Sequence, residues 1–251
     1  MKVFDCFLYL NEDAVLEVRL NELDPVVGYF VIVEATTTHS GKPKAINFDI
    51  NKPQFNKFKD KIIYILVTDL KPNPANTSIV DGYQRDYIPK ALVNAEDDDI
   101  IMLSDLDEIP RASILKALFS NMDDRNYRCI IDKHVFYFNS VSLGTWEHGT
   151  LITRYKNFRQ HLPSRWKANT GLPEVRIENA GWHFCYFGGR EGIIYKMGSY
   201  THTELDNEEG RNFFLDGLET EPVVEVMDDH YPQYVRDNIS KFLTHMKGIK
   251  E

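Results

Sequence analysis

Apolar runs alternate with helically spaced apolar residues along the first 120 positions of the chain. The continuous runs predict buried strands, which occupy residues 3–10, 29–33, 62–67 and 100–103. Helical spacing predicts helices at residues 13–23, 53–58, 80–95 (with a break at Pro89) and 111–119. Strands that alternate with helices are typical of a mostly parallel sheet with helices on both faces.

The pattern changes after residue 119. Residues 128–139 and 141–155 are rich in β-formers and aromatic side chains, which predicts an antiparallel extension of the sheet. A Pro- and Gly-punctuated stretch at 160–177 precedes an apolar strand at 180–187, a helix at 190–196 and a helical region at 208–247. The sequence therefore predicts one α/β domain over residues 1–251, with a mostly parallel sheet flanked by helices and with helices at its C-terminal end.

Charge and cysteine content narrow the function classes. The chain has 251 residues and a formal net charge of -9, which argues against general binding to nucleic acid or to an anionic membrane. Its cysteines, Cys6, Cys129 and Cys185, lie in strand-like contexts and indicate buried free thiols in a reducing compartment. Neither a signal peptide nor an apolar run of membrane-spanning length is seen, so we expect a cytoplasmic protein.

Carboxylates follow directly on the fourth predicted strand. Asp105, Asp107 and Glu108 come within four residues after its apolar run, and Pro110 then suits the first turn of a helix. Ligands of open α/β sheets bind at the carboxyl ends of the strands, and clustered carboxylates attract Mg²⁺ or Mn²⁺, which commonly bridge to phosphates. The alternative interpretation is an acidic first helical turn that complements the helix dipole.

A histidine further along could complete such a site. His183 lies in an aromatic strand, where an imidazole needs a polar partner, and it could serve as a third metal ligand or as a satisfied core histidine. Gly188 and Gly189 follow it and could offer backbone N–H groups to a phosphate, although a plain strand-to-helix turn explains them equally well.

The polar loop at 36–44 and a later arginine carry groups that suit a nucleotide. The loop follows a strand end and contains His39, Ser40, Lys42 and Lys44, which could bind a base, a ribose or a diphosphate; the alternative is an ordinary exposed loop. Arg85 could clamp a phosphate in bidentate fashion, or it could form an ion pair with a neighbouring aspartate.

Three further carboxylates are candidates for a general base. Asp132 and Glu147 lie in the aromatic middle region, which suits either a sugar-binding cleft or the core of a sheet, and Glu204 lies in a later polar segment. The sequence does not choose among these three residues.

Several segments, taken together and in order, resemble glycosyltransferase family 17, whose eukaryotic members add N-acetylglucosamine to N-glycans. The segments that carry the resemblance are VFDCFLYLNE at 3–12, FVIVEA at 30–35, THSGKPK at 38–44, YQR at 83–85, SDLDEIP at 104–110 and GWHF at 181–184. They extend over about the first three-quarters of the chain.

The resemblance implies a GT-A-like fold, a UDP-sugar donor (UDP-N-acetylglucosamine first) and a bound Mn²⁺ or Mg²⁺. It implies that Asp105 and Asp107 hold the metal and diphosphate, that Glu108 adds to this cluster, and that His183 is a distal metal or phosphate contact. Glu34, the loop at 38–44 and Arg85 would face the nucleotide. It further implies transfer, with inversion, to a hydroxyl of a glycan or glycoconjugate.

The eukaryotic members carry a Golgi anchor and stem that we do not expect in this chain, which leaves the acceptor open between a glycolipid precursor, a polysaccharide and a capsid or surface glycan.

Two other function classes compete with a glycosyltransferase. A nucleotidyltransferase also uses paired aspartates, but it needs a basic or Gly-rich phosphate loop after the first strand, where this chain has the acidic segment LNED at 10–13. A non-catalytic sugar-binding domain could use Trp146, Trp166 and Trp182. A glycoside hydrolase, a weaker third candidate, would need two carboxylates at a defined separation.

Overall fold

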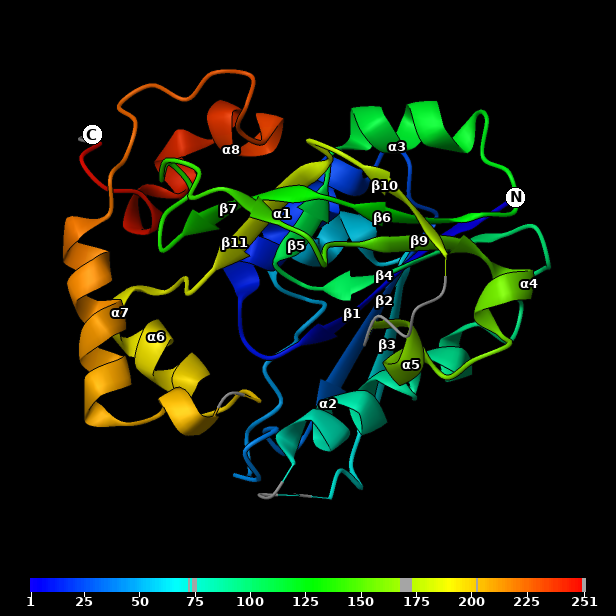
Figure 1. Cartoon of the computed structure of the whole chain (residues 1–251), viewed down its shortest axis with the longest axis horizontal. Helices are drawn as coiled ribbons and strands as arrows, with labels where there is room; N and C mark the ends of the chain where they lie inside the picture. Colours follow the sequence, from blue (N-terminus) through cyan, green and yellow to red (C-terminus); the bar gives the residue numbers. More distant parts are fainter. Residues whose placement is uncertain (72, 74–75, 168–172, 202, 250–251) are drawn as a thin grey trace.

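The computed structural model describes residues 1–71, 73, 76–167, 173–201 and 203–249 (Figure 1). Its main sheet has seven strands in the order β10-β6-β9-β4-β1-β2-β3. These are β1 (Val3–Tyr9), β2 (Tyr29–Ala35), β3 (Ile62–Val67), β4 (Ile100–Asp105), β6 (Asn126–Cys129), β9 (Leu151–Arg154) and β10 (Glu174–Ile177). All pairs are parallel except the two that β9 makes with β4 and β6. The expected α/β class with a mostly parallel sheet is confirmed.

A second sheet has four short strands in the order β5-β11-β7-β8. They are β5 (Glu108–Pro110), β7 (Ile131–Val135), β8 (Thr145–Trp146) and β11 (Gly181–Cys185). Only β7 and β11 run parallel to each other. The sequence did not predict this sheet, because β5 has only three residues and pairs with a strand 70 positions further along.

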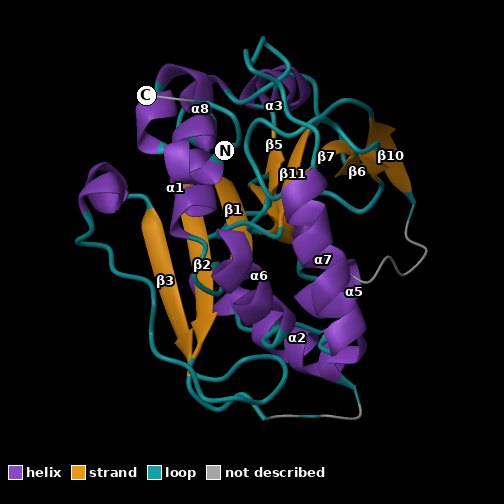
Figure 2. Ribbon diagram, turned by 90° about the vertical axis from the view of Figure 1, so that its left-hand side faces the viewer, coloured by secondary structure: helices purple, strands orange, loops and turns teal. Residues whose placement is uncertain are grey.

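Helices cover both faces of the main sheet (Figures 1 and 2). The α-helices are α1 (Asp13–Leu23), α2 (Thr77–Arg85), α3 (Ala112–Phe119), α4 (Tyr155–Phe158), α5 (Pro163–Lys167), α6 (Gly189–Met197), α7 (Glu208–Thr220) and α8 (Gln233–Asp237). The 3-10 helices are η1 (Pro53–Phe58), η2 (Ile88–Ala91), η3 (Thr203–Leu205), η4 (Ile239–Lys241) and η5 (Leu243–His245).

Alternation along the central strands divides the core. Phe7, Ile32 and Met102 point to the face covered by α1, and Cys6 and Val33 point to the face covered by α2 and α5. A third, smaller cluster joins α6 and α7, which pack side by side (Figure 2). The central strands thus read as continuous apolar runs because both of their faces are buried.

Several predicted boundaries were wrong. Pro110 ends β5 rather than opening a helix, and α3 begins two residues later. The helix expected at 80–95 is α2 followed by η2, so the chain breaks before Pro89. The long β-rich stretches at 128–139 and 141–155 form only short strands, and the region at 208–247 is largely irregular after α7. The Pro- and Gly-punctuated stretch at 160–177 lies partly outside the described residues, at 168–172.

Two expectations from composition can be compared with the structure. Cys6 and Cys129 are buried free thiols, and Cys185 is a free thiol of intermediate exposure. Among the described residues, no helix has the length and apolar character needed to cross a membrane. The cellular location stays a prediction.

Candidate active site

The turn that joins β4 to β5, residues 105–108, is fixed from below by a buried arginine. Arg19 of α1 is fully buried, and its Nη1 donates hydrogen bonds to the backbone oxygens of Asp105 (3.0 Å), Leu106 (3.0 Å) and Glu108 (2.9 Å). Its Nη2 also donates to Oγ of Ser104 at 2.6 Å. One guanidinium therefore holds the backbone of the whole carboxylate turn, as we call residues 105–108 below.

Arg19 is itself held by a buried carboxylate. Its Nε and Nη2 donate to the two oxygens of Asp5 at 2.8 and 2.6 Å, and both side chains have no exposed surface. The sequence did not lead us to expect this pair of Asp5 and Arg19. Its signal was present, since Asp5 interrupts an apolar strand and Arg19 lies between Val15 and Leu23 on the apolar face of a helix.

Glu108 stabilises the carboxylate turn through hydrogen bonds within the protein. Its carboxylate is fully buried; one oxygen accepts a hydrogen bond from the backbone N–H of Asp105 (2.9 Å), and the other accepts from Nε1 of Trp146 (2.8 Å). We therefore leave Glu108 out of the proposed metal ligands.

Asp105 pairs with Arg85, which explains why both residues lie here. Nη2 of Arg85 forms an ion pair with Asp105, while its Nε and Nη2 also bind Asp81 at 2.9 and 3.0 Å. Burial would lower the pKa of Arg85, but the two carboxylates raise it well above its usual range. The ion pair with a neighbouring aspartate is thus confirmed, since Arg85 binds Asp81, and a phosphate contact of Arg85 stays a prediction.

Asp107 is the centre of a compact charged group. Its Oδ2 accepts a hydrogen bond from Nζ of Lys196 at 2.8 Å, and its Oδ1 lies 3.6 Å from Nε2 of His183. Lys196 also lies 3.7 Å from Oε1 of Glu12, at the end of β1. Burial alone would raise the pKa of the Asp107 carboxyl, but Lys196 and His183 hold it well below its usual range.

His183 thus meets Asp107, as the sequence predicted, through the pairing of β11 with β5. Glu108 and His183 are register partners, so both belong to the same face of the small sheet. The ring of His183 packs on Trp146 with ring centroids 5.0 Å apart, and its Nδ1 is buried without a hydrogen-bond partner among the described residues. Lys196 was missed, because the sequence does not reveal where α6 lies.

The loop at 36–44 folds onto the end of α6. Oγ of Ser40 donates to the backbone oxygen of Gly198 (2.7 Å), and Nε2 of His39 lies 2.9 Å from Oε1 of Gln84. Lys42 is largely exposed and lies 4.0 Å from Asp206. Ser40 and His39 therefore fix the loop, and Lys42 remains accessible to a ligand.

Glu34 and Lys44 form a buried ion pair at the end of β2. The carboxylate of Glu34 also accepts hydrogen bonds from the backbone N–H groups of Asn47 (2.7 Å) and Phe48 (3.1 Å) and from the hydroxyl of Tyr64 (2.9 Å). Its acceptors are used within the protein, so Glu34 shapes the wall of the cavity described next.

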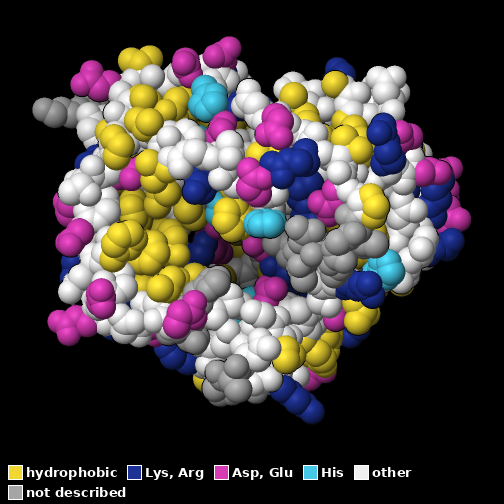
Figure 3. Space-filling model, in the orientation of Figure 1, with side chains coloured by type: hydrophobic (Ala, Val, Ile, Leu, Met, Phe, Trp, Pro, Cys, Tyr) yellow, Lys and Arg dark blue, Asp and Glu magenta, His cyan; other side chains and the backbone are white. Residues whose placement is uncertain are grey.

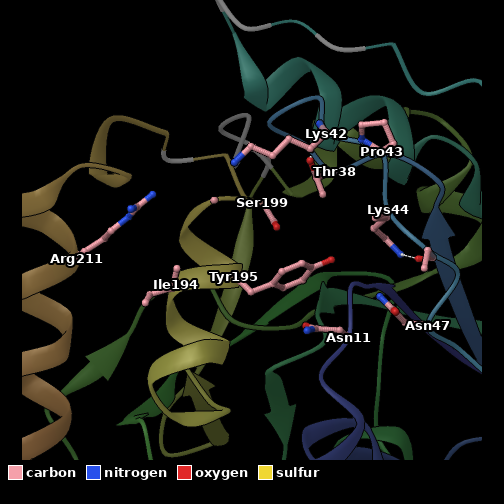
Figure 4. A pocket seen from close by; sticks show the side chains of 12 residues that line it. Asn11, Thr38, Lys42, Pro43, Lys44, Asn47, Ile194, Tyr195, Ser199 and Arg211 are labelled. Atoms are coloured by element: carbon pink, nitrogen blue, oxygen red, sulfur yellow. Dashed lines mark hydrogen bonds between the residues drawn. The ribbon is translucent and has the colours of Figure 1, made fainter.

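A cavity of about 640 Å³ opens where α6, the loop at 36–44 and the end of β1 meet. Figure 4 shows Tyr195 projecting from α6 across this space toward the loop that carries Lys44. Its lining residues are Asn11, Thr38, Lys42, Pro43, Lys44, Ala45, Asn47, Ile194, Tyr195, Gly198, Ser199 and Arg211. Three of these side chains are basic. The backbone N–H of Asn11, in the cavity wall, donates to the carboxylate of Glu12 (3.1 Å), which lies 3.7 Å from Nζ of Lys196. The cavity therefore adjoins the charged group around Asp107.

The three candidate bases lie in different places. Strand register puts Asp132 beside Trp182, on the face of the small sheet opposite to His183 and Glu108. There it lies 3.1 Å from Nε2 of His230, which contradicts its predicted place at the site. Because side chains alternate along a strand, the two faces cannot be exchanged without a register shift.

The other two candidates lie outside the sheet interior. Glu147 is exposed and pairs with Arg176, whose hydrogen bond lowers the pKa of the glutamate. Glu204 is exposed in η3 and lies close enough to Tyr200 to affect its pKa, whereas its neighbour His202 lies outside the described residues.

The tryptophans do not form an exposed sugar platform. Trp166 and Trp182 are each 3% exposed and belong to the core, and Trp146 is engaged with Glu108 and His183. This burial removes the feature on which the sugar-binding alternative depended. Figure 3 shows instead a hollow in which acidic, basic and histidine side chains meet beside an apolar area.

The donors near Asp107 suit a divalent cation, although their present arrangement is not a complete site. Among the described residues, no group of three or more His, Cys, Asp or Glu side chains is placed to hold a metal. Asp107 and His183 nevertheless point polar atoms toward each other, and the ammonium of Lys196 already brings a positive charge to the same carboxylate. Carboxylate with imidazole is a donor set that manganese accepts.

Comparisons with known proteins show what the chain is similar to. The human β-1,4-mannosyl-glycoprotein 4-β-N-acetylglucosaminyltransferase is 24% identical over 92% of this chain and 52% of its own length, so the chain spans about half the length of the curated relatives it matches. Among solved structures, a Francisella tularensis 2-C-methyl-D-erythritol 4-phosphate cytidylyltransferase is 8% identical, with a TM-score of 0.42 over 71% of this chain and 90% of that one.

A Mycobacterium tuberculosis glucosyl-3-phosphoglycerate synthase, solved with Mn²⁺ and UDP-glucose, is 9% identical, with a TM-score of 0.38 over 72% of this chain and 70% of that one. The model of glycosyltransferase family 17 matches residues 1–213, and these include the carboxylate turn, His183 and Lys196. The chain therefore belongs to glycosyltransferase family 17.

Proposed function

We propose that this single domain transfers N-acetylglucosamine from UDP-N-acetylglucosamine to a hydroxyl of a glycan or glycoconjugate, with a divalent metal and with inversion at the anomeric carbon. The observation that carries the proposal is the position of Asp107 and His183 beside a basic cavity at the carboxyl ends of β1 and β2. That edge is where open α/β sheets bind nucleotides. The names of the relatives support the choice of sugar.

The cavity is the proposed place of the nucleotide. Its volume of about 640 Å³ lies within the range of small-ligand sites, roughly 300–1,000 Å³. Lys42 and Arg211 line it with basic side chains that are 63% and 43% exposed, so they can reach an anionic ligand.

Asp107 and His183 are the proposed metal ligands, with Asp105 as an outer contact. A bound Mn²⁺ supplies Lewis-acid stabilisation of the leaving diphosphate. Arg85 keeps Asp105 ionised and fixed, and Arg19 keeps the backbone of the carboxylate turn in place. Pre-set charges of this kind need no reorganisation during the reaction.

Glu147 and Glu204 remain the proposed bases that take the proton from the acceptor hydroxyl. The pKa of Glu147 is lowered by its hydrogen bond from Arg176, which weakens this carboxylate as a base while that pair is intact. Replacing each glutamate in turn with glutamine distinguishes the two candidates. Only loss of the true base lowers kcat and removes the acidic limb of the pH profile of kcat while leaving the Kd of UDP unchanged.

Isothermal titration with UDP and UDP-N-acetylglucosamine, with Mn²⁺ or with EDTA, tests the donor. We expect binding that needs metal, that Asp107→Ala abolishes and that Asp97→Ala, a change in an exposed surface carboxylate, leaves intact. Absence of UDP binding in every condition would contradict the UDP-sugar donor. Release of diphosphate when the protein is given UTP and N-acetylglucosamine 1-phosphate would favour a nucleotidyltransferase, and proton NMR of the transferase product reports the anomeric configuration.

A further inference from the structure

Lys196 reaches the centre of the site from a helix that belongs to neither sheet. It lies on α6, which begins directly after Gly188 and Gly189, and both glycines adopt positive φ angles (96° and 62°) that other residues rarely accept. That turn directs α6 back over the edge of the sheet, so Nζ of Lys196 comes to 2.8 Å from Oδ2 of Asp107 and 3.7 Å from Glu12.

This contact is shielded from solvent. The side chains of Lys196, Asp107 and Glu12 are 19%, 9% and 16% exposed, so water and salt screen their charges far less than at an open surface. Lys196 therefore does not form an ordinary surface ion pair, in which solvent would screen most of the attraction. It neutralises two carboxylates that come from the ends of two different strands, β1 and β4.

The two oxygens of Asp107 face different partners. Oδ1 lies toward Nε2 of His183 and Oδ2 binds Lys196. A divalent cation held by Asp107 and His183 would share one carboxylate with the ammonium of Lys196, and the two positive charges would repel each other. Along the sequence, Lys196 directly follows Tyr195 and precedes Gly198 by two residues, and both of these line the cavity proposed for the nucleotide.

We propose that Lys196 is an internal counter-cation of Asp107, which weakens metal binding to the free protein and moves to the diphosphate when metal and nucleotide arrive together. This inference rests on the proposed function. The arrangement makes metal and nucleotide bind cooperatively, because the phosphate gives Lys196 a second anion to neutralise and thereby releases Asp107. Lys196 is then a positioning residue that sets the order of binding.

The test is a titration of the protein with Mn²⁺ in the absence of nucleotide, followed by the electron paramagnetic resonance signal of free Mn²⁺. We expect Lys196→Met to bind Mn²⁺ more tightly than the unaltered protein, by a factor within the roughly 5–150-fold range of typical coupling between sites. Lys196→Arg retains the positive charge and should bind Mn²⁺ about as the unaltered protein does. Lys61→Met removes one positive charge beside Asp24, just before the start of β3 at the amino ends of the central strands, and should have no effect.

A second titration adds UDP. In the unaltered protein UDP should raise Mn²⁺ affinity, and in Lys196→Met this gain should shrink, since the competing charge is already gone. Equal or weaker Mn²⁺ binding by Lys196→Met without nucleotide overturns the inference. If that variant does not fold, Lys196→Gln carries the same test and the same two outcomes.

Failure of the proposed function gives a different result. If no variant binds UDP in any condition, the nucleotide donor is wrong, whereas the Mn²⁺ affinities measured without nucleotide still decide whether Lys196 competes for Asp107.

Discussion

The buried pair of Asp5 and Arg19 gives the sharpest prediction from the structure. Replacing Arg19 with methionine keeps much of the side-chain length and leaves the carboxylate of Asp5 buried without its partner. Breaking a buried ion pair in this way costs about 3–5 kcal/mol of folding free energy. For a chain of this size that corresponds to a fall of roughly 6–20 °C in melting temperature, at about 2–4 °C per kcal/mol.

Arg19→Met should also loosen the carboxylate turn, because three backbone oxygens lose the donor that they share. The double variant Asp5→Leu with Arg19→Met removes both charges. We expect it to recover most of the stability, since apolar pairs of similar volume commonly replace buried ion pairs without loss. Its UDP affinity should stay low, because the turn still lacks its support.

The assay combines urea unfolding with isothermal titration of UDP and Mn²⁺. Arg128→Met is a matched control, because Arg128 is also buried (3% exposed) and pairs with Glu174, but it binds the backbone of Gly149 and Trp166 rather than the carboxylate turn. It should lower stability and, where folded, leave UDP affinity unchanged. Normal UDP affinity in Arg19→Met, or a stability loss below about 1 kcal/mol, would refute this reasoning.

Three further changes have defined outcomes. Trp146→Phe removes the hydrogen bond to a buried oxygen of Glu108 and should lower the unfolding free energy by about 1–3 kcal/mol. The loss should exceed that of Trp166→Phe, because the indole of Trp166 binds a neutral carbonyl. Equal losses in urea unfolding would contradict this. Burial lowers the pKa of His134 to about 4. The contribution of the neutral imidazole to folding stability should therefore be complete above pH 6.5 and be lost toward pH 4, by up to about 3 kcal/mol. His134→Gln should flatten this pH dependence when the unfolding free energy is measured at a series of pH values. Asp107→Asn should weaken Mn²⁺–UDP binding at least about 10–100-fold, the range that even supporting partners of metal ligands reach, and unchanged affinity by titration would exclude Asp107 as a ligand.

Local pattern predicted the first half of the fold because short-range rules act there. The helix over residues 13–23 and the strand over 62–67 match α1 and β3 at both ends, since apolar spacing and the proline at 25 mark them. The small sheet could not be found in this way. β5 has three residues, and its pairing with β11 depends on contacts that are distant in sequence.

The site was predicted to a similar extent and for similar reasons. Asp105 and Asp107 follow a buried strand, which is a local signal, and His183 was found through its unusual place among aromatic residues. Asp132 was assigned to the wrong place because a sequence does not state the register of β7 against β11, and one residue of shift would change its face. The sequence around Lys196 did not mark it as a site residue, because its place beside Asp107 depends on the direction that Gly188 and Gly189 give to α6.

Charge compensation explains how an acidic chain can present an edge that accepts an anion. The formal net charge is -9, yet carboxylates at the ends of the central strands each lie against a cation from another element. Asp105 meets Arg85, Asp107 meets Lys196, and Glu34 meets Lys44. Such partly or fully buried pairs give little net stability, so their value lies in fixing charges in place. Lys42 and Arg211, which both lie against the carboxylate of Asp206, then add positive charge at the cavity, and this local balance favours the nucleotide diphosphate that we propose there although the total charge of the chain is negative.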